Sequence, residues 1–307
     1  MRSHLSSYLI VLALAIGVFV VLPGAIHAQD DVISKETKEK IKEIEKIHKD
    51  VAIKEKSKGF CTNQNWNGDK VSTNELREQT VAATGRLEVD GARNGGISVR
   101  GENRSDVLVR ACVQTWGSSE QEAKSLASSV RINTGSVIKA DAPGEENWSV
   151  SYEIRAPRNS NLALRASNGG ISVKGIDGTM DLATTNGGVS ISDVSGDVRG
   201  RTTNGGISVA LVGAGWKGSG LDLQTTNGGV NLMLPTNFAA NVEAGTVNGG
   251  FSSDFPGLQV EKSDDNKYGP QPKKVNASIN GGGANVRVVT TNGGIRISST
   301  EKHDKYQ

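Results

Sequence analysis

The chain has 307 residues, of which 38 are Gly, 22% are charged, 36% are hydrophobic and only 4% are aromatic. This composition excludes collagen, a coiled coil and a fully disordered chain, and it is typical of a globular or repetitive protein. The formal net charge is only +2, from 35 Lys and Arg against 33 Asp and Glu. Because phosphate-driven binding needs a strongly basic surface, we expect no nucleic-acid partner.

Residues 1–28 have the pattern of a secretory signal peptide. Arg2 precedes an apolar run of 15 residues from Tyr8 to Leu22, and small residues around Ala28 form a cleavage site. An uncleaved membrane anchor is the alternative, but the run is shorter than the roughly 20 residues that span a bilayer. We therefore predict export to the periplasm or cell surface, with no transmembrane segment in the mature chain.

Residues 29–59 are rich in Lys and Glu and have a helical pattern. Ile41, Ile44, Ile47 and Val51 recur at spacings of three and four, which indicates a thin apolar stripe. Because runs of charge are usually solvated, we interpret the segment as a charged helical spacer. The alternative is a helix that binds a partner or a surface.

Residues 60–160 read as a strand-rich cap with one inserted amphipathic helix. Ser118 followed by Gln121 resembles a helix-capping signal. Apolar residues then recur at helical spacing, at Ala123, Leu126, Ala127 and Val130. Alternation from Trp148 onward predicts a half-buried strand that stops at Pro157.

Cys61 and Cys112 are the only cysteines of the chain. Export leads to an oxidising compartment, so we predict one disulfide between them rather than a metal or redox site. Closing such a loop stabilises by about 4 kcal/mol in the chain-entropy model. The alternation of strand 107–114 places Cys112 on the face opposite to the core, where it can reach a covering segment. Two unpaired thiols are the alternative.

The tripeptide Asn-Gly-Gly occurs eight times, far more often than chance allows. It begins at Asn94, Asn168, Asn186, Asn204, Asn227, Asn248, Asn280 and Asn292. Successive spacings of 18, 18, 23 and 21 residues from Asn168 to Asn248 fall in the range of solenoid repeats, in which every unit is one turn of structure.

The residues around each tripeptide predict two strands joined by a tight corner. Apolar residues stand three and five positions after Asn, as in Ile171 and Val173, and six and four positions before it, as in Leu162 and Leu164. The Gly-Gly pair permits the backbone angles of the corner. We therefore predict a mainly β fold: residues 161–300 form a parallel β-solenoid wound from a single sheet, followed by a charged tail at 301–307.

Stacking of these coils predicts rows of identical side chains. The repeat asparagines would form a hydrogen-bonded amide ladder. A second ladder would run through Thr184, Thr202, Thr225, Thr246 and Thr290. On the outward face, Asp181, Arg199 and Asp222 would place opposite charges on adjacent coils, which fixes register more than it stabilises.

The Asn-Gly-Gly-(Ile/Val)-Ser-(Val/Ile) repeats behind a signal peptide resemble a bacterial domain-of-unknown-function family labelled "putative adhesin". The resemblance covers roughly residues 80–300. It implies an exported β-solenoid, and some members of the family are encoded in cell-envelope stress operons. The family has no catalytic residues to transfer, so the resemblance implies no catalytic, cofactor-binding or metal-binding residues here.

A set of aspartates and one tryptophan are the candidate site residues. Asp177, Asp181, Asp193 and Asp197 could converge as in polysaccharide-degrading β-helix enzymes, but their spacing favours solvated turn residues. Trp216 interrupts the repeat in a glycine-rich stretch, so we expect a protruding loop and regard it as a candidate for ligand contact.

The sequence as a whole predicts a non-catalytic cell-envelope protein, an adhesin-like binding or structural scaffold without a cofactor. Repeated polar side chains on long faces suit multivalent contact with a repetitive ligand. The expected partner is an envelope polysaccharide or another protein. The alternatives are a polysaccharide-active β-helix enzyme and a regulatory component of the envelope stress response.

Overall fold

The computed structural model describes residues 59–62, 70–213, 215–260 and 272–300. The chain separates into two compact units, residues 1–55 and residues 56–307. The predicted signal peptide, almost all of the predicted spacer helix and the charged tail lie outside the described residues, so these remain predictions.

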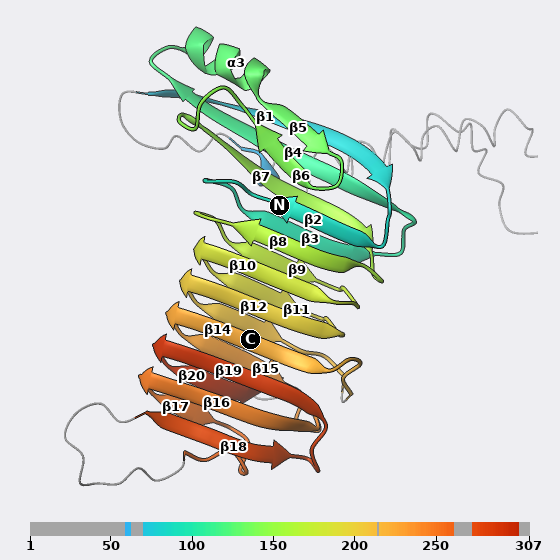
Figure 1. Ribbon diagram of the computed structural model, residues 1–307, viewed down its shortest axis with the longest axis vertical. Coiled ribbons are helices and arrows are strands. Elements are labelled where there is room, and N and C mark those ends of the chain that lie inside the picture. Colours follow the sequence, from blue (N-terminus) through green and yellow to red (C-terminus); the bar gives the residue numbers. More distant parts are fainter. Residues whose placement is uncertain (1–58, 63–69, 214, 261–271, 301–307) are drawn as a thin grey trace, which may run out of the picture. The chain divides into compact units, whose positions relative to one another are not determined.

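The described part of the second unit is built on two ten-stranded sheets (Figure 1). Sheet A has the order β1 (Val71–Ala82), β4 (Asp106–Gly117), β7 (Trp148–Pro157), β3 (Ile97–Glu102), β9 (Ile171–Lys174), β11 (Val189–Ser192), β13 (Ile207–Ala210), β15 (Val230–Leu234), β20 (Ile295–Ser299), β17 (Phe251–Ser253). Sheet B has the order β18 (Lys273–Ile279), β16 (Ala240–Asn248), β19 (Ala284–Asn292), β14 (Gly220–Asn227), β12 (Asp197–Asn204), β10 (Met180–Asn186), β8 (Asn161–Ala166), β2 (Arg86–Asp90), β6 (Ile138–Asp141), β5 (Arg131–Thr134).

Each coil consists of one strand of sheet B, an Asn-Gly-Gly corner and one strand of sheet A. Equivalent residues pair directly between coils, so Met180 lies beside both Leu162 and Val198. The mainly β, repetitive character predicted from the sequence is thereby confirmed. The expected single sheet is wrong, because the corner moves the chain from one sheet to the other. Nor is the fold purely parallel, since β1–β4, β4–β7, β5–β6 and β16–β18 are antiparallel pairs.

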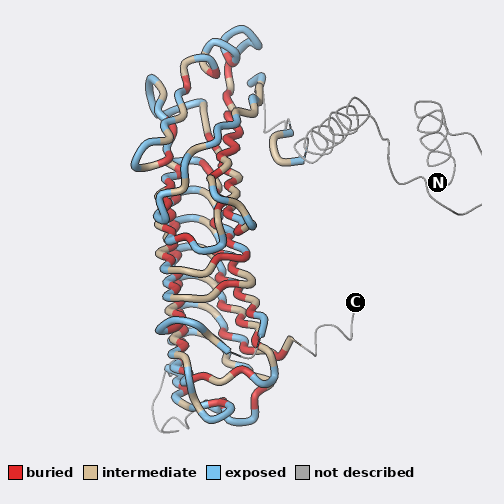
Figure 2. The backbone as a smooth tube through the Cα atoms, turned by 90° about the vertical axis from the view of Figure 1, so that its right-hand side faces the viewer, coloured by how far each residue is buried: buried red, intermediate tan, exposed pale blue. Residues whose placement is uncertain are grey.

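The core lies between the two sheets and is made by the alternating residues of every strand. In β9, for example, Ile171 and Val173 are buried while Ser172 and Lys174 are exposed. Figure 2 shows buried and exposed positions following one another along the backbone of the coils. The outward face of each sheet therefore remains free to carry polar side chains in regular rows.

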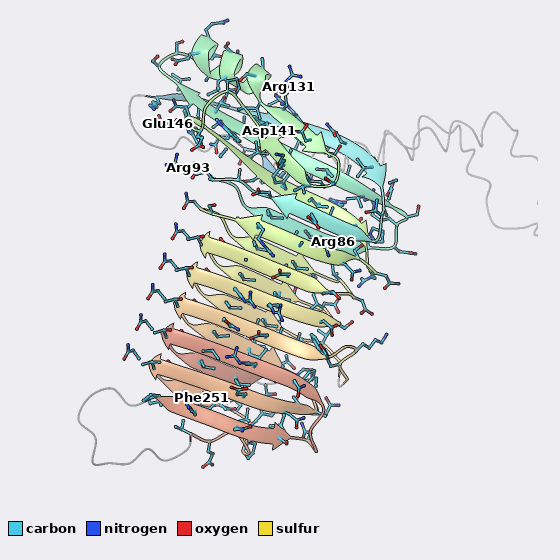
Figure 3. All side chains as sticks on the ribbon, viewed as in Figure 1. Arg86, Arg93, Arg131, Asp141, Glu146 and Phe251 are labelled. Carbon is cyan, nitrogen blue, oxygen red and sulfur yellow. A yellow bond between two sulfur atoms is a disulfide. The ribbon has the colours of Figure 1, made fainter. Side chains whose placement is uncertain are left out.

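The order of the coils differs from their order in the sequence. β19 lies between β14 and β16 in sheet B, and β20 lies between β15 and β17 in sheet A. The last coil of the chain is thus inserted between the two coils that precede it in the sequence. β18 closes the edge of sheet B by pairing antiparallel to β16. Phe251 of β17 and Arg131 of β5 lie near opposite ends of the unit (Figure 3).

The stack begins earlier than the sequence indicated. β2 and β3 flank Asn94 and pair in parallel with β8 and β9. They form the first coil, so the boundary expected at residue 161 falls inside the stack. The remaining strands of segment 60–160 extend both sheets beyond this coil.

The inserted helix α3 (Glu120–Ser129) covers the end of β4, where the Thr115 hydroxyl donates to the Ala123 carbonyl at 2.7 Å. Its N-cap is Ser119, whose hydroxyl accepts from the Glu122 backbone N–H at 3.2 Å. The expected pairing of Ser118 with Gln121 is therefore displaced by one residue. Ser118 instead binds the Glu122 carboxylate through its backbone N–H at 2.8 Å.

Candidate binding groove

Seven of the repeat asparagines stand in one column at the corners between the sheets. The side-chain amide of each donates to the side-chain oxygen of its neighbour, at 2.7–3.0 Å. In spatial order the column contains Asn94, Asn168, Asn186, Asn204, Asn227, Asn292 and Asn248. This ladder fixes the coils in vertical register along one edge of the stack.

The prediction that Asn280 is a repeat corner is wrong. Asn280 lies between the antiparallel strand β18 and strand β19, with a positive φ of 49°. Its amide donates to the carbonyls of Thr236 and Phe238 at 2.9 and 2.8 Å. The same tripeptide thus serves a turn of a different kind, because Asn and Gly are the residues that tolerate positive φ best.

The threonines before the corners stand in one row as predicted, but their hydroxyls bond backbone carbonyls rather than one another. Each is buried, and its hydroxyl donates to the carbonyl of the first corner glycine of the neighbouring coil. Thr184 bonds Gly169 at 2.7 Å, and Thr202 bonds Gly187 at 2.8 Å. Thr225, Thr290 and Thr246 make the same contact at 2.8 Å. The row locks adjacent corners together from inside.

The two glycines of each corner have different reasons to be glycine. A Cβ on the first would lie 2.3 Å from the Gly169 carbonyl oxygen at Gly187, and 2.1 Å from that of Gly187 at Gly205. No L side chain fits there. A Cβ on the second would lie 3.3 Å from the next coil at both Gly170 and Gly188, which requires only a small shift. The second glycine therefore leaves open space on the outer face.

This open space is a groove of about 960 Å³ on the outer face of sheet A, which we call the seryl groove. Its floor contains the second corner glycines Gly96, Gly170, Gly188, Gly206, Gly229 and Gly294. Beside them runs a row of small polar residues, Ser98, Ser172, Ser190, Ser208 and Asn231. The groove follows the stack axis and crosses the strands at right angles.

Strand pairing keeps this polar row in exact register. Ser172 pairs with Ser98 on one side and with Ser190 on the other, and Ser208 continues the row to Asn231. Neighbouring strands lie about 4.8 Å apart, so the groove presents one hydroxyl or amide per coil at that interval.

At one end of the seryl groove, beneath Phe60, lies a buried arginine that pairs with two partly exposed carboxylates. Arg110 is only 1% exposed and donates to Glu78 and Glu153 at 2.7 Å each, while the Phe60 ring lies 5.6 Å from its guanidinium carbon. Burial acts to lower the pKa of Arg110, but hydrogen bonds to the two carboxylates raise it overall. The arginine therefore stays charged, and Phe60 lines the groove directly above it.

Cys61 and Cys112 form a disulfide with their Cα atoms 5.4 Å apart. Cys112 faces outward on β4, opposite Ser151 of β7, which lines the seryl groove. The bond fastens segment 59–62 onto the outer face of sheet A at this end. The alternation of strand 107–114 indicated the same orientation for Cys112.

Three exposed cations flank the polar row. Arg100 and Lys174 stand two residues after Ser98 and Ser172 on the same face, and Arg296 continues the row beyond Asn231. None of the three lies within 4 Å of a carboxylate in the described part of the chain. Two carboxylates on this face, Glu102 and Glu153, are paired with arginines.

The outer face of sheet B has a different electrostatic character. Its corresponding row alternates strictly in charge through Asp181, Arg199, Asp222, Arg287 and Glu243. Asp222 lies 3.0 Å from Arg287 and 3.8 Å from Arg199, and Arg165 pairs with Asp181 from the side. Charge in this alternating row is therefore neutralised within the molecule, whereas the three cations beside the polar row of the seryl groove have no such partners among the described residues.

The four candidate aspartates do not converge on one site but fall into two pairs, with Asp181 and Asp197 beside one pocket and Asp177 and Asp193 beside another. Asp181 lies on the outer face of sheet B, and Asp193 approaches Arg158 at 3.8 Å. Hydrogen bonds from the Ser219 side chain and from its backbone N–H, the latter at 2.5 Å, lower the pKa of the Asp197 carboxyl. Asp177 and Asp193 share a small pocket with Arg158. Among the described residues no group of three or more His, Cys, Asp or Glu is arranged to hold a metal ion.

The expected exposure of Trp216 is wrong. Its ring is half-buried against the core, its indole N–H donates to the Gly196 carbonyl at 2.9 Å, and it meets Phe238 edge to face at 6.4 Å. The residues that interrupt the repeat thus contribute an aromatic side chain that covers the core on one side of the stack. These contacts give Trp216 a structural role and do not support a role in ligand contact.

A protein-family model described as Toastrack DUF4097 matches residues 43–298. Among solved structures, a "putative cell adhesion protein" from Clostridium sporogenes is similar at 13% identity, with 74% of this chain and 100% of that chain covered and a TM-score of 0.40. A "putative adhesin" from Bacteroides fragilis is similar at 8% identity, with 74% and 97% covered and a TM-score of 0.36. No curated protein matches significantly. In the described ranges, no helix is long and apolar enough to cross a bilayer.

Proposed function

The chain belongs to the Toastrack DUF4097 family, and from this premise we propose that it is a non-catalytic, exported scaffold that binds a polymer of the cell envelope along the seryl groove. The observation that carries this proposal is the groove itself. It offers a small polar group, a hydroxyl or an amide, once per coil and exposed cations beside this row. A repeated surface of this kind favours a repeated ligand, because each added contact is intramolecular once the first has formed.

Export is part of the proposal and has two supports. The first 28 residues have the pattern of a signal peptide. The Cys61–Cys112 pair, which forms a disulfide, suits an oxidising compartment outside the cytoplasm. Fractionation of cells that express the chain tests this directly: we expect the processed protein in the periplasm or at the cell surface, and a full-length cytoplasmic protein would contradict it.

The groove also favours a binding role through its rigidity. Its floor is made of paired strands whose corners are fixed by the Asn and Thr contacts, so little conformational entropy is lost when a ligand is ordered on it. We propose that this preorganised face holds the protein on an envelope polymer, as an adhesin or as a structural scaffold.

The proposed function is tested by co-sedimentation of the purified chain with isolated cell envelopes and with peptidoglycan. We expect a saturable bound fraction that weakens as salt is raised, because exposed cations are screened. A chain that remains in the supernatant with every envelope fraction would contradict the proposal.

A further inference from the structure

We propose that the ligand of the seryl groove is an extended anionic glycan lying along the stack axis. This inference rests on the proposed function and adds the chemical class of the polymer. It follows from the spacing of the polar row, the open glycine floor, the unpaired cations and the length of the groove.

The spacing favours a glycan over a peptide. The hydroxyls of Ser172, Ser190 and Ser208 recur at about 4.8 Å, whereas an extended peptide rises about 3.4 Å per residue and drifts out of step with them. One coil is comparable in length to one sugar unit of an extended glycan. Moreover, the central strands of sheet A already pair on both sides, so a peptide lying on this face has no strand edge to join.

The floor favours a ligand that approaches the backbone closely. The second corner glycines, such as Gly188 and Gly206, have no positive φ, and a Cβ there would lie 3.3–3.4 Å from the next coil. Stacking alone therefore excludes a side chain far less strictly there than at Gly187 or Gly205. Because the second corner glycines have no side chain, the groove has a flat floor on which sugar rings can lie across the strands.

The charge favours acidic groups on the glycan. Arg100, Lys174 and Arg296 border the polar row and have no carboxylate within 4 Å in the described residues. On the outer face of sheet B, in contrast, the charges of the alternating row neutralise one another. Carboxylate, sulfate or phosphate groups carried at intervals by a glycan would complete these ion pairs.

The length of the groove sets the size of the ligand. Its lining runs from Ser151 on β7 to Gly294 beside β20, which spans seven strands of sheet A. Six intervals of about 4.8 Å give about 29 Å. Affinity should therefore rise with oligomer length up to about six sugar units and then level off, apart from statistical gains on longer chains.

The ligand class is tested by calorimetric titration of the purified full chain with three probes. These are oligogalacturonates of graded length, the same oligomers with their carboxyl groups reduced to alcohols, and poly-L-glutamate. We expect the oligogalacturonates to bind at least tenfold more tightly than the reduced oligomers and than poly-L-glutamate. Equal binding of the reduced oligomers would overturn the anionic requirement, and tighter binding of poly-L-glutamate would overturn the choice of a glycan.

The location is tested with variants that leave the core untouched. We expect Ser190→Tyr to obstruct the groove and the double change Arg100→Gln and Lys174→Gln to remove two cations, each weakening oligogalacturonate binding at least tenfold. The matched controls are Arg201→Tyr and Arg201→Gln on the exposed outer face of β12, which should bind like the unchanged chain. Thermal unfolding and circular dichroism establish that each variant is folded. Folded groove variants that bind normally would overturn the inference.

The same variants separate this inference from the proposed function. If Ser190→Tyr still sediments with envelopes as the unchanged chain does, the groove is not the binding surface and the inference fails, although envelope binding stands. If the unchanged chain binds oligogalacturonates in the groove but no envelope fraction, the proposed envelope role fails and the ligand class stands.

Discussion

The side-chain amide of Asn248 donates to the side-chain oxygen of Asn292 at 2.8 Å, although Asn292 follows it by 44 residues. Asn292 in turn donates to Asn227, which precedes both in the sequence. The coil that contains Asn248 therefore has no contact with the coil before it through this ladder. Its place in the stack depends on a strand that is synthesised later.

Deleting the last strands should therefore release an earlier coil. In a chain that ends at residue 260, β16 loses both β19 and β18, which are its partners in sheet B. We expect amide hydrogen exchange in residues 240–248 to lose its protection, whereas β10 and β12 remain protected. Retained protection in β16 would mean that it pairs directly with β14, and that the inserted coil is not required to hold it.

Alanine at the first corner glycine should lower the free energy of unfolding much more than alanine at the second. Gly187→Ala places a Cβ 2.3 Å from the Gly169 carbonyl oxygen, so the coils must separate, and we expect a loss of about 3 kcal/mol or more. Gly188→Ala meets the Gly206 carbonyl at 3.3 Å and gains from a less flexible unfolded chain, so we expect a change within about 1 kcal/mol. Urea unfolding of the two variants measures the difference. Equal losses would contradict the distinct roles assigned to the two positions.

The coils themselves could be predicted from the sequence because each carries its own signal. Alternation on both sides of Asn-Gly-Gly places Ile171 and Leu162 inward whatever their neighbours are, and the structure has them buried. The order of the last coils could not be predicted in this way. The residues of β14, β16 and β19 have the same inward pattern, so any of them can lie beside another without loss of apolar burial.

Local pattern also failed where one motif serves two geometries. Asn280-Gly281-Gly282 is identical in sequence to the true corners, but all three residues have positive φ, and they lead the chain from β18 on one side of β16 to β19 on its other side. For Trp216, the sequence showed only a break in the repeat. Its burial depends on Phe238 and on the Gly196 carbonyl, which belong to other coils.

The seryl groove is not predicted by the sequence patterns, although the residues that line it belong to the repeats. The alternation of each strand turns its serine outward, but a groove forms only because strand register brings Ser98, Ser172, Ser190 and Ser208 into one row. The second glycine of each repeat is the one signal of the groove in the sequence. The corner does not require this glycine, so its presence in every repeat indicates an outer surface that is kept free of side chains.

The Glu75–Arg77 pair should make stability depend on pH. Hydrogen bonds from Arg77 at 2.9 Å lower the pKa of the Glu75 carboxyl below its ordinary value of 4.5, against an opposing effect of burial. Arg77 also donates to the Ala127 carbonyl at the end of α3. Because the folded pKa is the lower one, the contribution is present above pH 4.5 and is lost as the pH falls through the folded pKa.

We therefore expect Glu75→Gln to be less stable than the unchanged chain near neutral pH, with the difference in stability narrowing as the pH is lowered below 4.5. Urea unfolding at several pH values measures this. In an Arg77→Met background the same change should produce no pH-dependent gap. A gap of constant size across the pH range would show that the carboxylate charge is not responsible.

Replacing Arg110 alone should lower the free energy of unfolding more than replacing it together with its two carboxylate partners. Arg110→Met removes the two charge-assisted hydrogen bonds to the partly exposed Glu78 and Glu153 beneath Phe60, and we expect a loss of about 2 kcal/mol. Adding Glu78→Gln and Glu153→Gln removes the uncompensated charges and should restore part of that loss. Urea midpoints of the single and triple variants decide the matter. A triple variant that is less stable than the single one would contradict this account of the cluster.

The Cys61–Cys112 bond should stabilise the chain mainly by closing a loop across a separation of 51 residues. In the chain-entropy model its loss costs about 4 kcal/mol, and it also frees the segment that holds Phe60 over Arg110. We expect the double change Cys61→Ser and Cys112→Ser to lower Tm, and a reductant to lower the Tm of the unchanged chain by a similar amount. The control is the double variant with reductant, whose Tm should not move. If the reductant lowers that Tm as well, it acts on something other than this bond, and if neither treatment changes Tm, the bond does not constrain the unfolded chain.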